Sequence, residues 1–256
     1  MKSDENLQTA RNPAEFLEIL RTERNELINV LRKTRFSTLK PGYPHSQVIP
    51  YATYSPWVCD IEFLNIYEVA RAHTLIDIYR CYELYSLAKQ QASIEGDLVE
   101  VGVWRGGSAA ILASAMPLKT AHLFDTFEGV VKADSRFDTL YEGGEHSDAS
   151  TQQVTALFDS LSISCAIHVG IFPEDTLSDL PEKISLAHID VDTYASAKES
   201  FDKIWPRVVV SGVVIFDDYG AFGCEGVTQF VSETIRDTAD ALMVHNLNGH
   251  ALLIKR

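Results

Sequence analysis

The chain has 256 residues, which suits one large domain or one domain with an appendage. Hydrophobic residues make up 46% and charged residues 23% of it, so it can bury a full core, and intrinsic disorder and collagen-like repeats are excluded. The formal net charge of −14 repels phosphate backbones and argues against general nucleic-acid binding. No apolar run approaches the roughly 20 residues that a membrane helix needs.

The N-terminus and the cysteines indicate a reducing compartment. The segment MKSDENLQTARNPAEF is polar and acidic and lacks the apolar core of a signal peptide. Cys59, Cys81, Cys165 and Cys224 form no CxxC pair and show no metal-ligand spacing with histidines. We therefore expect free thiols that are buried or half-buried, no disulfide framework and a cytoplasmic protein.

The first part of the chain predicts helices and an aromatic arm. Apolar residues recur with a helical period over 13–32, and Asn12 is placed to cap that helix. Residues 35–57 are rich in proline and aromatic residues without a period, which indicates an extended arm. Two more helices are expected at 60–72 and 74–93. We expect residues 1–95 to form an N-terminal region of helices and arm, whose aromatic helices offer a surface for a homo-oligomer.

From residue 96 onward strands and helices alternate. Strands are expected at 97–103, 121–125, 165–170, 185–191 and 212–218, and helices at 107–116, 150–161, 194–204 and 225–236. Short apolar strands separated by helices predict a parallel sheet that is covered on both faces. The last two strands flank Leu247-Asn248-Gly249, which predicts an antiparallel hairpin. We therefore expect an α/β, Rossmann-like sheet over 96–256. Its terminal antiparallel hairpin is typical of Rossmann-like methyltransferases and is usually missing from dinucleotide dehydrogenases.

Candidate ligand-binding residues follow the first strand, because ligands in open α/β sheets bind at the carboxyl ends of strands. The turn EVGVWRGGS lets the backbone approach a ligand, and the next helix offers unpaired N–H groups to an anion. Its GxxxGG spacing differs from the GxGxxG that grips a pyrophosphate, and it suits the carboxylate of S-adenosylmethionine, with Ser108 as a donor. The alternative is an ordinary strand-to-helix turn.

Residues after the second and third strands fit the rest of such a cofactor. Asp125 lies where a βαβ unit presents an acid to ribose hydroxyls, and the alternative is a helix cap. Phe127 places an aromatic ring near an adenine, and Ile171 and Phe172 supply apolar groups for its other face.

Three carboxylates follow the fourth and fifth strands. HIDVD contains Asp190, and FDDYG contains Asp217 and Asp218. Neighbouring strands would bring these groups together, where their charges repel one another and burial of any one is costly. A hard divalent cation removes the conflict, and oxygen ligands with open positions suit Mg²⁺. The alternative is that the acids cap helices and face water.

The segments GDLVEVGVWRGGSA, LFDTFEGV, HIDVDTY and IFDDYG, in this order and spacing, resemble the macrocin O-methyltransferase family over about residues 55–256. The resemblance implies a class I enzyme that uses S-adenosylmethionine and Mg²⁺ to methylate sugar hydroxyls of natural products. By position, it implies that Asp190, Asp217 and Asp218 are the metal ligands. The expected cofactor-binding residues are Glu100, Gly102, Trp104, Arg105, Gly106, Ser108, Asp125, Thr126, Phe127, Ile171 and Phe172.

Methyl transfer to an alkyl hydroxyl needs a base, because the hydroxyl is a poor nucleophile near neutral pH. Asp190, as ligand and base together, is the first candidate. His146 in the loop EGGEHSD is the second, and its alternative role is that of a solvated loop residue. Metal-dependent catechol methyltransferases place a lysine just past the first metal aspartate, whereas this chain has no lysine there before Lys198.

Other functions remain open at this point. A phenolic or catechol-like acceptor fits the same site, because two vicinal hydroxyls of either kind chelate a metal. A non-catalytic S-adenosylmethionine-binding module has no reason to keep three repelling carboxylates. A nicotinamide-dependent oxidoreductase is disfavoured by the missing GxGxxG and by the terminal hairpin. The expected partner is a small hydroxylated acceptor, with neither nucleic acid nor membrane.

Overall fold

The computed structural model describes residues 12–31, 36, 39–42, 54–246 and 248–256. Its contacts divide the chain into two compact units, Met1–Ile49 and Pro50–Arg256. The first unit holds helix α2 (Pro13–Leu31), which begins where the side chain of Asn12 accepts the N–H of Glu15 at 2.9 Å. The predicted cap and helix are therefore confirmed. Most of the expected aromatic arm lies outside the described residues.

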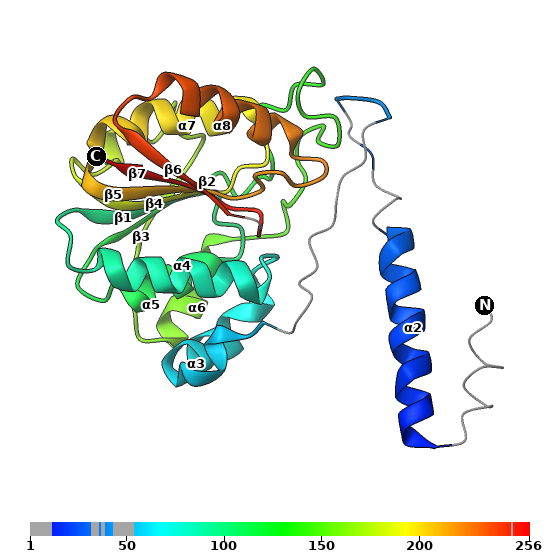
Figure 1. Ribbon diagram of the computed structural model, residues 1–256. Coiled ribbons are helices and arrows are strands. Elements are labelled where there is room, and N and C mark those ends of the chain that lie inside the picture. Colours follow the sequence, from blue (N-terminus) through cyan, green and yellow to red (C-terminus); the bar gives the residue numbers. More distant parts are fainter. Residues whose placement is uncertain (1–11, 32–35, 37–38, 43–53, 247) are drawn as a thin grey trace. The chain divides into compact units, whose positions relative to one another are not determined.

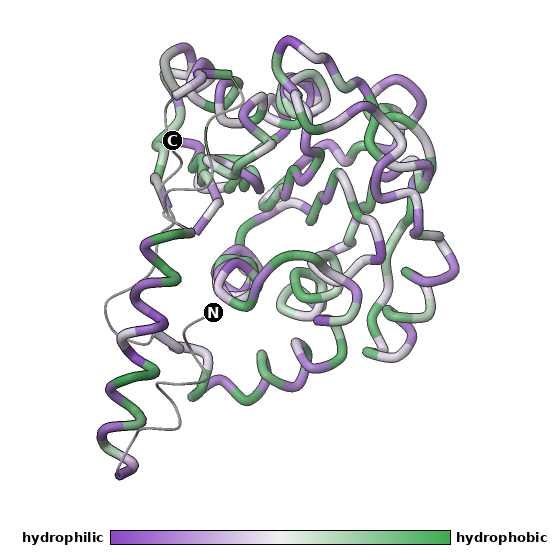
Figure 2. The backbone as a smooth tube through the Cα atoms, turned by 90° about the vertical axis from the view of Figure 1, so that its right-hand side faces the viewer, coloured by the Kyte–Doolittle hydropathy of each residue, from purple (hydrophilic) through white to green (hydrophobic). Residues whose placement is uncertain are grey.

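Helix α2 is amphipathic along its whole length. Figure 2 shows hydrophobic and hydrophilic residues alternating along it. Its apolar side chains are exposed at Phe16, Leu17, Leu20, Leu27 and Val30. The apolar residues whose helical spacing predicted α2 therefore form an exposed stripe along the helix.

The second unit contains a seven-stranded sheet with the order β3-β2-β1-β4-β5-β7-β6 (Figure 1). The strands are β1 (Asp97–Val101), β2 (Ala121–Asp125), β3 (Ala166–Val169), β4 (Ile184–Ile189), β5 (Val208–Phe216), β6 (Ala241–His245) and β7 (Ala251–Lys255). The first five are parallel, and β7 runs antiparallel to both β5 and β6. The predicted parallel sheet with its terminal hairpin is confirmed.

Helices cover both faces of this sheet. They are α3 (Ile61–Ala70), α4 (Ile78–Gln91), α5 (Gly107–Ala115) and α6 (Thr151–Ser160) on one face, and α7 (Tyr194–Ile204) and α8 (Glu225–Asp237) on the other (Figure 1). The sequence predicted that α4 begins at residue 74. It begins at Ile78 because the carboxylate of Asp77 accepts the N–H groups of Tyr79 and Arg80 and so caps it.

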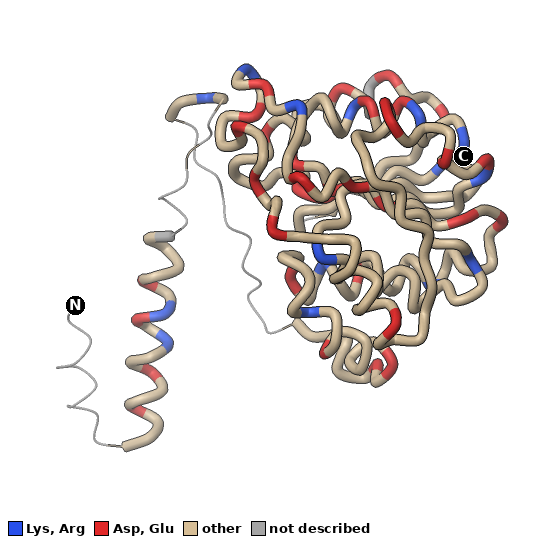
Figure 3. The backbone as a smooth tube through the Cα atoms, turned by 180° about the vertical axis from the view of Figure 1, so that it is seen from behind, with Lys and Arg blue, Asp and Glu red and all other residues tan. Residues whose placement is uncertain are grey.

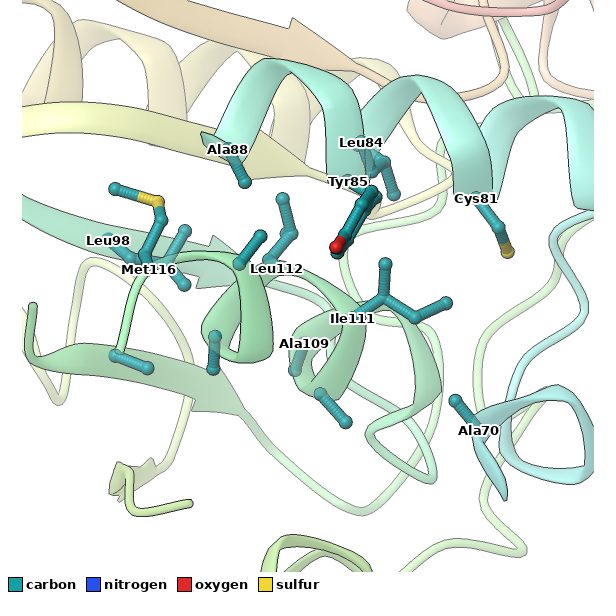
Figure 4. Packing of buried hydrophobic residues seen from close by; sticks show 14 of the residues in the cluster. Ala70, Cys81, Leu84, Tyr85, Ala88, Leu98, Ala109, Ile111, Leu112 and Met116 are labelled. Carbon is teal, nitrogen blue, oxygen red and sulfur yellow. The ribbon is translucent and has the colours of Figure 1, made fainter. Parts of the chain in front are cut away.

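The core forms two layers, one on each side of the sheet. In the first, α4 packs on α5 and on β4, and Leu84, Leu112 and Leu98 are fully buried (Figure 4). Full burial of each such side chain contributes about 1.5–3 kcal/mol. Phe201, Phe216 and Phe230 anchor the second layer under α7 and α8. Since both faces are filled, the edge at the carboxyl ends of the strands is where a ligand has room.

The cysteines and the helices bear on two further expectations. All four cysteines are free, with Cys81 and Cys224 buried and Cys165 half-buried. Cys59 is exposed, against expectation, because it ends the short surface turn Pro56–Cys59. Among the helices of the described residues, none has the length and apolar character that crossing a membrane requires.

Candidate functional site

A cavity of about 300 Å³ opens at the carboxyl ends of β1, β2, β4 and β5. The predicted site residues that line it are Gly102, Trp104, Ser108, Asp125, Thr126, His146, Phe172, Asp190, Asp217 and Asp218. The remaining predicted cofactor residues, Glu100, Arg105, Gly106, Phe127 and Ile171, lie outside this lining. The structure thus brings the glycine-rich turn and the three carboxylates to one space.

The glycine-rich turn lies very close to the end of β4. Gly102 has a φ of +84°, and a Cβ there would lie 1.8 Å from the carbonyl oxygen of Asp190. Only glycine allows this approach. Ser108 is buried in the first turn of α5, which follows Gly106 with its left-handed backbone. The turn therefore places the N-terminus of α5 at the cavity. It lies there beside the carboxylate edge, by which we mean Asp190, Asp217 and Asp218 at the ends of β4 and β5.

Asp125 ties two turns together. One of its oxygens accepts the N–H groups of Val103 and Trp104 at 2.6 and 2.9 Å, and the other accepts the N–H of Phe127 at 2.6 Å. The carboxylate thus fixes the loop after β1 against the loop after β2. Asp125 also lines the cavity, so the carboxylate that holds these two loops together can be reached from the cavity.

Trp104 and Arg105 hold the long loop after β2. The Nε1–H of Trp104 and the guanidinium of Arg105 both donate to the carboxylate of Asp148, at 2.7 and 2.5 Å. The guanidinium also lies 4.4 Å from the centre of the Trp104 ring. Hydrogen bonding by Trp104 lowers the pKa of Asp148. In this structure Arg105 therefore contacts the loop rather than the cavity.

Glu100 is a buried residue of β1 that pairs with His188 of the neighbouring strand β4. Its side chain is fully buried, and one oxygen is 2.7 Å from Nδ1 of the buried His188. The other oxygen and the Nε2 of His188 have no hydrogen-bond partner among the described residues. Glu100 thus belongs to a buried polar layer beneath the cavity, next to the face covered by α4.

Asp190 and Asp218 are half-buried carboxylates at the edge of the cavity. No described residue donates a hydrogen bond to the side chain of Asp190. Its backbone N–H donates to the carbonyl oxygen of Val101. Burial, followed by the charges of Asp217 and Asp218, raises the pKa of Asp190. Burial and the charge of Asp217 likewise raise the pKa of Asp218. Figure 3 shows the acidic residues of this unit in red.

Asp217 is surrounded by positive partners. Its Oδ1 lies 2.6 Å from Nη1 of Arg80 and 3.4 Å from Nε2 of His250. His250 in turn lies 2.6 Å from the carboxylate of Glu83. Burial opposes ionisation of Asp217, but His250 and Arg80 outweigh it and hold the pKa below its ordinary value. Burial likewise opposes protonation of His250, yet Asp217 and Glu83 raise its pKa to about 9.

Sequence reasoning missed Arg80, His250 and Glu83. Arg80 and Glu83 lie on α4 and His250 precedes β7, far along the chain from the carboxylates. No local pattern marks them as site residues. The one signal was that Arg80 and Glu83 are charged residues in the otherwise apolar and aromatic first half of α4, because burying such groups requires partners.

One wall of the cavity is formed by the loop after β2. The hydroxyl of Tyr141 donates to Asp192 at 2.9 Å, and both contact Cys224. Burial and Asp192 raise the pKa of Tyr141 strongly. His146 lines the cavity nearby. His146, Asp192, Asp218 and Trp104 all have a positive φ, a costly backbone for such residues that often marks a functional site.

Carboxylate oxygens around a cavity are the donors that Mg²⁺ prefers, and the free side chain of Asp190 fits that use. Two groups of described residues hold potential ligand atoms within 4.8 Å of one another: His188, Asp217 and His250, and Asp192, Asp218 and Cys224. Asp217 and Asp218 each belong to one group, and Asp190 to neither. The donors therefore fit a hard cation in kind, and they would have to turn toward one another to enclose it.

The sheet order and the position of the cavity define a Rossmann-like fold of the methyltransferase class. The fold is similar to that of the solved O-methyltransferase NovP, with a TM-score of 0.63 and 22% identity over 72% of this chain and 82% of that one. The macrocin-O-methyltransferase (TylF) family model matches residues 69–243. The chain belongs to this family, which confirms the resemblance read from its motifs.

Two relatives come from Streptomyces. The chain is 31% identical over 170 residues to the 8-demethyl-8-(2,3-dimethoxy-alpha-L-rhamnosyl)-tetracenomycin-C 4'-O-methyltransferase of Streptomyces olivaceus, covering 60% of this chain and 65% of that protein. It is 29% identical over 167 residues to the demethyldecarbamoylnovobiocin O-methyltransferase of Streptomyces niveus, covering 59% and 63%. The match spans less than two thirds of the length of either relative.

Proposed function

We propose that the protein is an S-adenosylmethionine-dependent O-methyltransferase that acts on a sugar hydroxyl of a small glycosylated molecule, in the cytoplasm, with Mg²⁺ as a further cofactor. The observation that carries the proposal is a single cavity lined by both the Gly102 turn and the carboxylates of Asp190, Asp217 and Asp218. Family membership supports the reaction, and the printed name of the first relative supports a sugar as acceptor.

The cofactor side of the site consists of the turn after β1 and the start of α5. Gly102 holds the turn against β4, and the N-terminus of α5 with Ser108 offers donors to the methionine carboxylate. Asp125 already accepts three backbone N–H groups. A carboxylate has about four acceptor positions, so it can still accept from a ribose hydroxyl. Ribose binding and loop closure therefore depend on the same side chain.

The acceptor side needs a group that takes the hydroxyl proton. Bound S-adenosylmethionine would supply the methyl group and leave as the thioether, and Asp190 would take the proton that the hydroxyl loses. Asp190 suits this role because it has no donor among the described residues and its pKa is raised. Mg²⁺ held by Asp190, Asp217 and Asp218 would lower the pKa of an acceptor hydroxyl. His146, on the loop after β2, also lines the cavity and is the second candidate base.

Calorimetry with S-adenosylmethionine and with NADPH tests the class of enzyme. We expect binding of the sulfonium compound alone, and binding of NADPH alone would refute the proposal. A screen of glycosylated and catechol acceptors with a labelled methyl donor then tests the substrate, and turnover of catechols alone would replace the sugar by a phenol. Undiminished activity in EDTA would refute the role of Mg²⁺.

A further inference from the structure

Arg80 is the single lysine or arginine among the described residues that line the cavity. The same lining holds five carboxylates, those of Asp125, Asp190, Asp192, Asp217 and Asp218. The edge that the sequence predicts to need a metal therefore already contains one cation of the chain itself. That cation comes from α4, outside the strand ends that carry the carboxylates.

The position of Arg80 is fixed at both ends of its guanidinium. Nη1 lies 2.6 Å from Oδ1 of Asp217 and 3.7 Å from Oδ1 of Asp218. Nε lies 3.1 Å from Asp77, whose other oxygen caps α4. The side chain of Arg80 is only 16% exposed, so solvent screens these contacts weakly.

We propose that Arg80 is the built-in counter-cation of the carboxylate edge, and that a divalent cation binds Asp217 and Asp218 only in competition with it. The inference rests on the proposed function, because it assumes a metal at these carboxylates. Two cations that share the same carboxylates repel each other strongly where the effective dielectric is about 20. Arg80 therefore weakens metal binding, and it neutralises the edge when no metal is bound.

Whether removal of Arg80 strengthens or weakens metal binding depends on His250, the second partner of Asp217. Nε2 of His250 lies 3.4 Å from Oδ1 of Asp217, and Nδ1 lies 2.6 Å from Glu83, so contacts that do not involve Arg80 hold the imidazole in place. Asp217 therefore keeps a positive neighbour and remains available as an anionic ligand without Arg80. Were Arg80 needed to keep Asp217 ionised or in place, its removal would weaken metal binding, which is the opposite result.

The test is Mn²⁺ binding to the full chain without cofactor or acceptor, followed by electron paramagnetic resonance of free Mn²⁺. We expect Arg80→Met to bind Mn²⁺ about tenfold more tightly than the wild type, because a nearby positive charge is removed. Arg80→Lys, which keeps the charge, should stay within about threefold of the wild type. Arg71→Met is the matched control and should change nothing, since Arg71 is an exposed arginine whose one ion-pair partner among the described residues is Glu68.

A second variant guards against a misfolded Arg80→Met. Asp77→Asn keeps an oxygen for the cap of α4 and removes the charge that holds Nε of Arg80. Arg80 then pairs with Asp217 and Asp218 alone, so Mn²⁺ binding should weaken. Equal or weaker binding by a folded Arg80→Met, or tighter binding by Asp77→Asn, overturns the inference alone. No Mn²⁺ binding by any of the proteins overturns it together with the proposed metal dependence.

Discussion

The backbone N–H of Asp217 donates to the carbonyl oxygen of Ile189 at 3.0 Å. This bond continues the ladder in which Ile189 pairs with Phe216, so β4 and β5 end level. Asp190 and Asp217 are consequently the first residues beyond two neighbouring strands. The backbone ladder, rather than any side-chain contact, brings the predicted carboxylates to one edge.

Replacing Asp190 tests the base. Asp190→Asn keeps the shape and removes the proton acceptor, so kcat should fall by about 10²–10⁴. Affinity for S-adenosylmethionine should change by no more than a few-fold, because the cofactor residues lie on other turns. Single-turnover assays with labelled methyl donor and calorimetry measure the two quantities. His146→Gln is the comparison: an equal loss there, with activity kept in Asp190→Asn, would transfer the role to His146.

Replacing Gly102 tests the close approach of the glycine-rich turn to β4. Gly102→Ala places a methyl group 1.8 Å from the carbonyl oxygen of Asp190 and forces alanine into a left-handed backbone. The free energy of unfolding should fall by about 3 kcal/mol or more. Gly144→Ala is the matched control, because Gly144 has a φ of +89° with nothing within 4 Å of a Cβ. It should lose only about 1–2 kcal/mol in the same urea titration. Equal losses would show that backbone strain alone matters.

Replacing Asp125 tests whether one carboxylate both holds the two loops together and binds the ribose. Asp125→Asn offers one oxygen to three backbone N–H groups, so at least one loses its partner, at a cost of about 1–3 kcal/mol. Both the unfolding free energy and the affinity for S-adenosylmethionine should therefore fall. Asp175→Asn is the control, since Asp175 accepts a single N–H, from Ile171, which asparagine can still satisfy. A loss of affinity at unchanged stability would contradict the loop-closing role of Asp125.

The sequence was sufficient for the sheet and for most of the cavity, because both follow from local patterns. Apolar strands and the turns after them predict Gly102, Asp125 and Asp217 at one edge whatever the details of packing. Arg80 and His250 escaped prediction because their partners are brought to them only by the packing of α4 on the sheet and by the terminal hairpin. The pattern gave the charges that need neutralising, and long-range packing supplied part of the neutralisation.

Glu100 and Arg105 lie outside the cavity lining, although their position in the motif predicted that they bind the cofactor. Both predictions follow from position in the motif, which cannot tell on which side of the backbone a side chain finds its partner. The side chain of Glu100 contacts His188 of the neighbouring strand β4, and that of Arg105 contacts Asp148 on the loop after β2. Their part in cofactor binding stays a prediction.

The pairing of the buried His250 with the half-buried Glu83 predicts a pH-dependent stability. The pKa of His250 is raised from 6.5 to about 9 because Asp217 and Glu83 favour its charged form. A raised pKa means that the folded state binds the proton more tightly, so the stabilisation is complete below pH 6.5 and is lost as the pH rises through 9. The loss over this range should be on the order of 3 kcal/mol.

Urea unfolding in EDTA at several pH values between 6 and 9.5 measures this loss, with His250→Gln as the comparison. The variant should be less stable than the wild type near pH 6, where it lacks the charged pair. As the pH rises, His250 of the wild type loses its proton and the two proteins should converge. A difference that stays constant with pH would mean that His250 stabilises the fold by packing and neutral hydrogen bonds. A difference that grows with pH would mean that the imidazole is neutral in the folded protein and that Asp217 relies on Arg80 alone.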